Sequence, residues 1–212
     1  MNEQTQPLRL PWTLSERHRH VCAFFRSPDE EYVLMLPFIQ EGVELGNKIW
    51  YIVDPDLRNQ HLRVMAQAGM DADALRENDQ LEVRPWEEAH LRPGYFDQDA
   101  MLNLVDDFLA SNERQGNRAT RIWSNQEWAL KDLPGVGEIV EYESRWNDMS
   151  AKHQVLTVCV YDLTRFGGGI IMDMLRTHPF ALVGGILYEN PFYSPPEEFQ
   201  RELRRRQPAV AR

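Results

Sequence analysis

Short runs rich in apolar and β-branched residues alternate along the chain with longer segments in which apolar positions recur every three or four residues. The short runs predict six strands, at His20–Phe25, Lys48–Val53, Leu81–Pro85, Ala119–Ser124, Val155–Tyr161 and Ala181–Tyr188. The fifth run is nearly all apolar, which is typical of a parallel strand covered on both faces, so we expect it near the middle of the sheet. The alternation predicts an α/β fold with a mostly parallel central sheet flanked by helices on both faces.

The longer segments predict amphipathic helices. Three apolar stripes are formed by Met35, Phe38, Ile39 and Val43, by Met101, Leu104, Val105 and Phe108, and by Ile139, Tyr142, Trp146 and Met149. We expect these stripes to lie in the core, because this period is typical of a buried helix face. Glu141 and Glu143 flank Tyr142, so at most one of them should face inward. Pro37 lies inside the first helix and predicts a kink there.

Composition narrows the class of protein. A chain of 212 residues is long enough for one domain with its own core. The 23 basic and 33 acidic residues give a net charge of −10, which would repel a phosphate backbone, so we expect no direct contact with nucleic acid. No apolar run approaches the length of about 20 residues that a membrane span requires, and the first residues lack the apolar core of a signal peptide. We therefore expect a cytoplasmic protein without a membrane partner.

The cysteines and histidines give no metal-binding motif. Cys22 and Cys159 both lie in apolar strand runs, so buried, reduced thiols are the first interpretation and a redox or metal role is the alternative. The six histidines are scattered and no CxxC or HxxxH spacing occurs, so we predict no structural metal and no cofactor. His178 precedes Pro179 at the end of a predicted helix, where the helix dipole favours a histidine.

The turn after the first strand, residues 26–31, lies where a parallel α/β fold usually binds its ligand. A phosphate-binding loop would need glycines and a lysine, as in GxxxxGKS, and this turn has neither. Ser27 and Glu30 instead predict a capping box with Pro28 at the first helical position. The three carboxylates of the first turn would repel a triphosphate. Arg26 remains as one cation that either pairs with a surface carboxylate or binds an anion.

Two further turns at predicted strand ends allow more than one interpretation. Asp54 is followed by Pro55 after the second strand, so we expect Asp54 to cap the next helix and to point into the same crevice. Gly167, Gly168 and Gly169 follow the fifth strand. A flexible connection is the first interpretation of these glycines, and an anion-binding loop is the alternative.

Polar and aromatic residues gather near the predicted strand ends, as expected of a pocket for a small, weakly polar ligand. The candidate ligand contacts are Arg26, Asp54, Trp123, Asn125, Glu127, Trp128, Tyr161 and Asp162. Aromatic packing and helix capping explain each of these residues equally well. The residue types alone therefore do not separate a binding site from a structural role.

Several segments resemble, in order, a known sensory family, the MEDS domain (methanogen/methylotroph, DcmR-type). They are EEYVLMLPFIQEGVELGNKIWYIVDPD, GYFDQDAM, RIWSNQEWAL, EIVEYESRWN, TVCVYDLTRF and HPFALVGGILYENPFY. We accordingly expect a flexible lead-in over residues 1–17, a sensory domain over 18–195 and a charged C-terminal helix or tail over 196–212. The arginines 204–206 of that tail are either solvated or available to an acidic partner.

The resemblance implies a sensory input domain, found in proteins with histidine kinase or DNA-binding domains and proposed to detect small hydrocarbon derivatives. The opening is also similar to KaiC/RecA-like ATPases, which implies a three-layer sandwich. Two departures from those ATPases argue against hydrolysis: the Walker A loop is replaced by RSPDEE, and the fourth strand ends in Trp123, Ser124 and Asn125 instead of a magnesium-binding aspartate.

Three hypotheses for function follow. The first is a non-catalytic sensory domain that binds a small organic ligand and regulates a histidine kinase or transcription regulator. No such output segment follows Tyr193, so the partner would be a separate protein, and the chain could also form a homodimer. The second is a degenerate ATPase fold that binds proteins and no small ligand. The third is an enzyme with Asp54, Glu127 or Asp162 as its general base.

Overall fold

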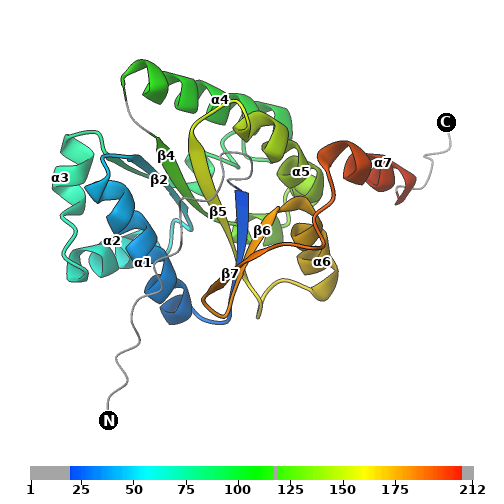
Figure 1. Ribbon diagram of the computed structural model, residues 1–212, viewed down its shortest axis with the longest axis horizontal. Coiled ribbons are helices and arrows are strands. Elements are labelled where there is room, and N and C mark those ends of the chain that lie inside the picture. Colours follow the sequence, from blue (N-terminus) through cyan, green and yellow to red (C-terminus); the bar gives the residue numbers. More distant parts are fainter. Residues whose placement is uncertain (1–19, 117–118, 207–212) are drawn as a thin grey trace, which may run out of the picture.

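The computed structural model describes residues 20–116 and 119–206, and within these residues seven strands form one sheet (Figure 1). The strands are β1 (His20–Phe25), β2 (Lys48–Val53), β3 (Leu81–Pro85), β4 (Thr120–Asn125), β5 (Val155–Asp162), β6 (Phe180–Val183) and β7 (Ile186–Glu189). Their order is β3-β2-β4-β5-β1-β6-β7, and every neighbouring pair is parallel except β6 with β7. The predicted α/β fold is confirmed, and β5 lies in the middle of the sheet as expected.

Helices cover both faces of this sheet (Figure 1). They are α1 (Pro28–Glu44), α2 (Arg58–Gln67), α3 (Ala72–Glu77), α4 (Gln98–Arg114), α5 (Ile139–Ser150), α6 (Gly168–Thr177) and α7 (Pro196–Arg206), with short 3-10 turns η1 (Trp86–Glu88), η2 (Glu127–Leu130) and η3 (Val136–Glu138). Helices α1, α2 and α3 pack on one face, and α4, α5 and α6 pack on the other. The arrangement is a three-layer sandwich.

The two faces of the sheet carry separate cores because successive strand residues point in opposite directions. In β1, Cys22 and Phe24 join the core beneath α4, α5 and α6, whereas Val21 and Ala23 join the core beneath α1, α2 and α3. All six residues of β1 are buried. The apolar stripes predicted for the three helices lie in these cores, either fully or partly buried.

The prediction of a single last strand at Ala181–Tyr188 is wrong. This stretch contains two antiparallel strands, β6 and β7, in which Val183 pairs with Ile186 across a two-residue turn. The turn is made by Gly184 and Gly185, with φ of +56° and +78°. Two consecutive positive φ angles match the tight turn that joins the strands of a hairpin, and glycine adopts them without strain.

The N-termini of three helices, α1, α2 and α6, can be compared with the predictions. Ser27 caps α1, with its Oγ accepting from the Glu30 N–H at 3.3 Å, which confirms the serine half of the predicted capping box; the Glu30 carboxylate accepts from the N–H of Arg26, one residue before the cap, at 2.9 Å. The prediction that Asp54 caps α2 is wrong, because α2 begins only at Arg58. Oδ1 of Asp54 instead accepts a hydrogen bond from the N–H of Asp56 at 3.0 Å. The three glycines after β5 form the cap and first turn of α6 and not a flexible connection. Helix α1 continues through Pro37, where a kink remains a prediction.

The charged C-terminal segment forms α7, which packs on the domain, and its arginines 204–206 are exposed. Phe199 is completely buried, Arg176 pairs with Glu202 at 2.5 Å, and Arg206 pairs with Asp173 at 2.7 Å. The predicted lead-in and residues 207–212 lie outside the described residues. None of the described helices is long and apolar enough to cross a membrane.

Candidate functional site

Five residues meet where parallel strands end at one edge of the sheet, and we call them the carboxyl-edge cluster. Trp123 and Asn125 lie on β4, Glu127 follows that strand at the start of η2, and Asp162 ends β5. Glu31 reaches the same place from the first turn of α1. Ligands of open α/β sheets bind at this edge, which makes the cluster the first candidate site.

Glu31 is the centre of the carboxyl-edge cluster. Its side chain is buried, and its Oε1 accepts hydrogen bonds from Trp123 Nε1 at 2.9 Å and from Asn125 Nδ2 at 3.1 Å. Burial, followed by the charge of Glu127, raises the pKa of Glu31 to about 8, although the two hydrogen bonds act in the opposite direction. The carboxyl of Glu31 is therefore mostly protonated at neutral pH.

Glu127 is the second carboxyl with a raised pKa. Burial is the main cause and lifts its pKa to about 7. The charges of Asp162 and Asp54 raise the pKa further, and the charge of Arg165 lowers it. Asp54 thus lies close enough to influence the pKa of Glu127. A region so rich in carboxyl groups disfavours an anionic ligand.

Three aromatic side chains and His61 pack against one another next to Glu31. Trp123 stacks on Tyr51 with ring centroids 4.0 Å apart and an interplanar angle of 14°. The hydroxyl groups of Tyr51 and Tyr32 both contact Nδ1 of His61, Tyr32 at 2.8 Å. Burial lowers the pKa of His61 to about 4, so its ring is neutral at physiological pH. These contacts fix the position of the indole that donates to Glu31.

Four of the predicted contact residues are not part of this cluster: Asp54, which lies near Glu127, and Arg26, Trp128 and Tyr161. Arg26 is exposed at the start of α1. Trp128 is buried beneath α4 and α5, where it stacks on His90 with centroids 4.6 Å apart. Tyr161 points to that same face of the sheet and donates its O–H to Glu143 at 3.2 Å. Successive residues of a strand face opposite sides of the sheet, which separates the side chain of Tyr161 from that of Asp162.

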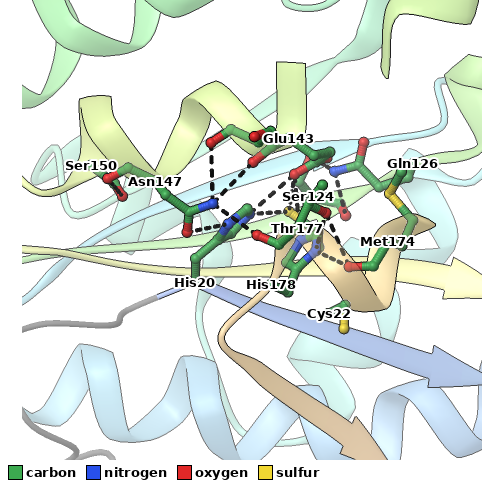
Figure 2. A network of polar contacts seen from close by, with 12 residues as sticks. His20, Cys22, Ser124, Gln126, Glu143, Asn147, Ser150, Met174, Thr177 and His178 are labelled. Carbon is green, nitrogen blue, oxygen red and sulfur yellow. Dashed lines mark hydrogen bonds and ion pairs between the residues drawn. The ribbon is translucent and has the colours of Figure 1, made fainter. Parts of the chain in front are cut away.

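Tyr161 contacts a second group of buried polar side chains, which we call the buried tetrad: His20, Glu143, Cys159 and His178. Figure 2 shows His20, Glu143 and His178 of this group with their polar contacts. They come from β1, α5, β5 and the junction between α6 and β6. One ligand atom from each side chain lies within 4.8 Å of the others. All four are at most 3% exposed. Histidine, thiolate and carboxylate are common ligands of transition metals, so the set could hold an ion.

Electrostatics inside the tetrad favour an ionised Glu143. Burial raises the pKa of Glu143, but the hydrogen bonds and charges of His178 and His20 outweigh burial and hold the pKa well below its usual range. Burial and the neighbouring His178 lower the pKa of His20 to about 4. Burial, then Glu143, raise the pKa of the Cys159 thiol. An ionised Glu143 therefore lies beside a protonated Cys159 thiol in a site shielded from water.

Sequence reasoning missed the tetrad as a group. It predicted two buried thiols, and Cys22 and Cys159 are both buried and free. It also predicted that at most one of Glu141 and Glu143 faces inward, and Glu143 is the buried one. The available signal was an acidic residue on an apolar helix stripe, four residues after Ile139. The prediction that no structural metal binds used only local spacing, whereas these four residues come from distant segments.

Comparison with known families identifies the domain. The family description "MEDS: MEthanogen/methylotroph, DcmR Sensory domain" matches residues 19–179. The chain belongs to the MEDS family. This confirms the resemblance found in the sequence and supports a sensory or regulatory role for the domain.

Two similar proteins extend this comparison. The transcriptional repressor DcmR of Methylorubrum extorquens is 23% identical to this MEDS chain over 163 residues, which cover 76% of this chain and 58% of the repressor. The MEDS chain thus spans little more than half the length of that relative. A KaiC-like protein from Pyrococcus horikoshii is 15% identical, with a TM-score of 0.55 over 77% of this chain and 69% of its own. That likeness shows a shared fold.

Proposed function

We propose that this MEDS domain is a non-catalytic sensor that binds a small, uncharged organic ligand at the carboxyl-edge cluster and regulates a separate kinase or transcription regulator. The observation that carries the proposal is a buried, mostly protonated Glu31 at the edge where related folds bind their ligands. Family membership and the similarity to a transcriptional repressor support the regulatory part.

The polar groups of the cluster suit an uncharged ligand with a hydrogen-bond donor. Asn125 is 4% exposed, and its Oδ1 is a buried acceptor without a hydrogen-bond partner among the described residues. Leaving such an atom unpaired costs about 1–3 kcal/mol, so a hydroxyl or amide N–H placed there would gain most of that energy. Trp123 and Tyr51 provide the apolar wall that a weakly polar ligand needs.

The same edge is unsuited to a nucleotide. The first turn of α1 carries Asp29, Glu30 and Glu31, and the capping box already occupies N–H groups that would bind a phosphate. Arg26 donates its backbone N–H to the Glu30 carboxylate at 2.9 Å. We therefore propose that the phosphate-binding function of the ATPase fold has been lost here.

The test is a thermal-shift screen of the full chain against small alcohols, amides and halogenated hydrocarbons, with MgATP included. We expect an uncharged compound, and not MgATP, to raise the melting temperature by linkage. Asn125→Leu should abolish the shift. Asn112→Leu removes an equally buried amide, which bonds Thr120 far from the edge, and should retain it.

A shift with MgATP, or a shift lost equally in both asparagine variants, would contradict the proposal. A folded protein that responds to no compound would favour the alternative, a protein-interaction module with no small ligand. Consumption of a stabilising compound, followed by mass spectrometry, would show that the raised carboxyl pKa values serve catalysis instead.

A further inference from the structure

The buried tetrad brings four metal-ligand atoms together at distances typical of one coordination sphere. His20 Nε2 lies 3.1 Å from Glu143 Oε2 and 3.4 Å from Cys159 Sγ. Glu143 Oε2 is 3.6 Å from Cys159 Sγ and 3.4 Å from His178 Nε2. A tetrahedral zinc ion with bonds of about 2.0–2.3 Å holds its ligands about 3.3–3.8 Å apart. Three of the four separations lie in that range, the fourth is 0.2 Å shorter, and all four ligand atoms lie within 4.8 Å of one another.

The surrounding hydrogen bonds orient both imidazoles for coordination. Nδ1 of His178 lies 2.7 Å from the Met174 carbonyl oxygen, which can only accept, so Nδ1 carries the proton. Nε2 of His178 then presents a lone pair to the tetrad. This atom is buried and lies 3.4 Å from Oε2 of Glu143.

His20 is held in the same way by Asn147. The amide Nδ2 of Asn147 donates to backbone carbonyl groups, including that of Thr177 at 2.8 Å, and this fixes its Oδ1 as the group facing His20. Nδ1 of His20 donates to that oxygen at 3.3 Å, which leaves the Nε2 lone pair directed at Glu143 and Cys159. A second nitrogen that donates to a carbonyl is the usual support of a metal-binding histidine.

Both Nε2 atoms lie beside the same carboxylate oxygen of Glu143, so one cation could be bound by all three groups. Glu143 already has its other oxygen occupied, because Tyr161 donates to Oε1. Zn²⁺ bound by one carboxylate, one thiolate and two neutral imidazoles has no net charge, which suits a site shielded from water. Thiolate and imidazole ligands favour zinc over calcium or magnesium.

We propose that the buried tetrad binds one structural Zn²⁺ ion through His20 Nε2, Glu143 Oε2, Cys159 Sγ and His178 Nε2. The Cys159 S–H bond breaks on binding, sulfur keeps the electron pair, and the proton passes to solvent. Four protein ligands leave no position for water, so the ion ties β1, α5, β5 and the start of β6 together. The inference is independent of any ligand at the carboxyl edge.

The experiment measures metal in the full chain, purified without chelators, by mass spectrometry of its elements. We expect about one zinc ion per chain. Cys159→Ser should remove most of it, and Cys22→Ser is the matched control because this thiol is equally buried on the adjacent strand, with its Sγ near the Phe180 carbonyl. Replacement of zinc by Co²⁺ should give a sulfur-to-cobalt charge-transfer band that Cys159→Ser abolishes.

A milder variant covers the case in which ligand substitutions prevent folding. Tyr161→Phe removes only the O–H that supports Glu143, so the chain should fold and bind zinc about 10-fold more weakly in competition with a chelator. His153→Ala changes a histidine outside the tetrad, which pairs with Asp106, and should leave the affinity unchanged. Folded wild-type chain that contains no zinc and takes up neither Zn²⁺ nor Co²⁺ overturns the proposal, as does equal metal loss in the two serine variants.

Discussion

Replacing Glu31 by glutamine should make the protein more stable at alkaline pH. The glutamine oxygen can still accept from Trp123 and Asn125, but the side chain no longer ionises. In the wild type the pKa rises from its usual 4.5 to about 8 on folding, chiefly because Glu31 is buried. The folded state therefore holds a proton that the unfolded state releases, and stability falls as pH rises between these two values.

The rise in pKa sets the size of the effect. Each unit of pKa difference corresponds to about 1.4 kcal/mol, so a rise from 4.5 to about 8 lowers the free energy of unfolding of the wild type by at most about 5 kcal/mol above pH 8. Local movement and entry of water would reduce this energy. We therefore expect Glu31→Gln to gain about 2 kcal/mol relative to the wild type between about pH 5 and about pH 8.5.

Urea unfolding followed by tryptophan fluorescence at several pH values measures this difference. Below the unfolded pKa both states of the wild type hold the proton, so only a constant offset should separate the two proteins. Glu141→Gln changes the charge of a partly exposed carboxylate on α5 and serves as the control. Stability curves of the wild type and Glu31→Gln that stay parallel over the whole range would refute the reasoning.

Three further substitutions test the packing. Trp123→Phe removes the N–H donated to Glu31, so it should cost about 1 kcal/mol in urea unfolding and raise the pKa of Glu31 further, measured by carboxyl NMR; an unchanged pKa would contradict the model of the cluster. Gly135→Ala should lower the free energy of unfolding by at least about 2 kcal/mol, because φ is +83° and the new Cβ would lie 2.0 Å from the Phe96 carbonyl oxygen. Gly137→Ala places its Cβ in open space and should lower it by about 0.5 kcal/mol or less. Equal losses in the two variants would be inconsistent with this account. Phe199→Ala should cost about 3 kcal/mol and expose the α7 amides to hydrogen exchange, and full protection of those amides would count against the docking of α7.

Most of the sheet could be predicted because its strands are short apolar runs with clear limits. Five strands agree with the predicted bounds within one residue, as in β4, predicted at Ala119–Ser124 and found at Thr120–Asn125. The sixth prediction failed because the apolar run continues on both sides of Gly184 and Gly185. A pair of glycines between apolar residues is itself a signal for a hairpin.

The candidate site was predictable only in part, because strand-end positions follow from topology and side-chain direction does not. The carboxyl ends of β4 and β5 meet as expected, which brings Asn125 near Asp162. The sequence predicts Glu31 only as one of three carboxylates in the first turn of a helix. Its burial could not be predicted, because it depends on how α1 packs over β4. The tetrad could not be predicted from local spacing, because its residues are far apart in the sequence. His20 and His178 come within 3.9 Å, measured between ring centroids, only when β1 pairs with β6 in the folded sheet.

The position of β1 has a consequence for how the chain folds during synthesis. β1 pairs with β5 and β6, so this strand leaves the ribosome well before its partners, which lie more than a hundred residues later in the chain. Contacts so distant in sequence slow folding, and until they form β1 exposes two unpaired edges. We therefore expect the nascent chain to depend on chaperone protection until β6 has been made.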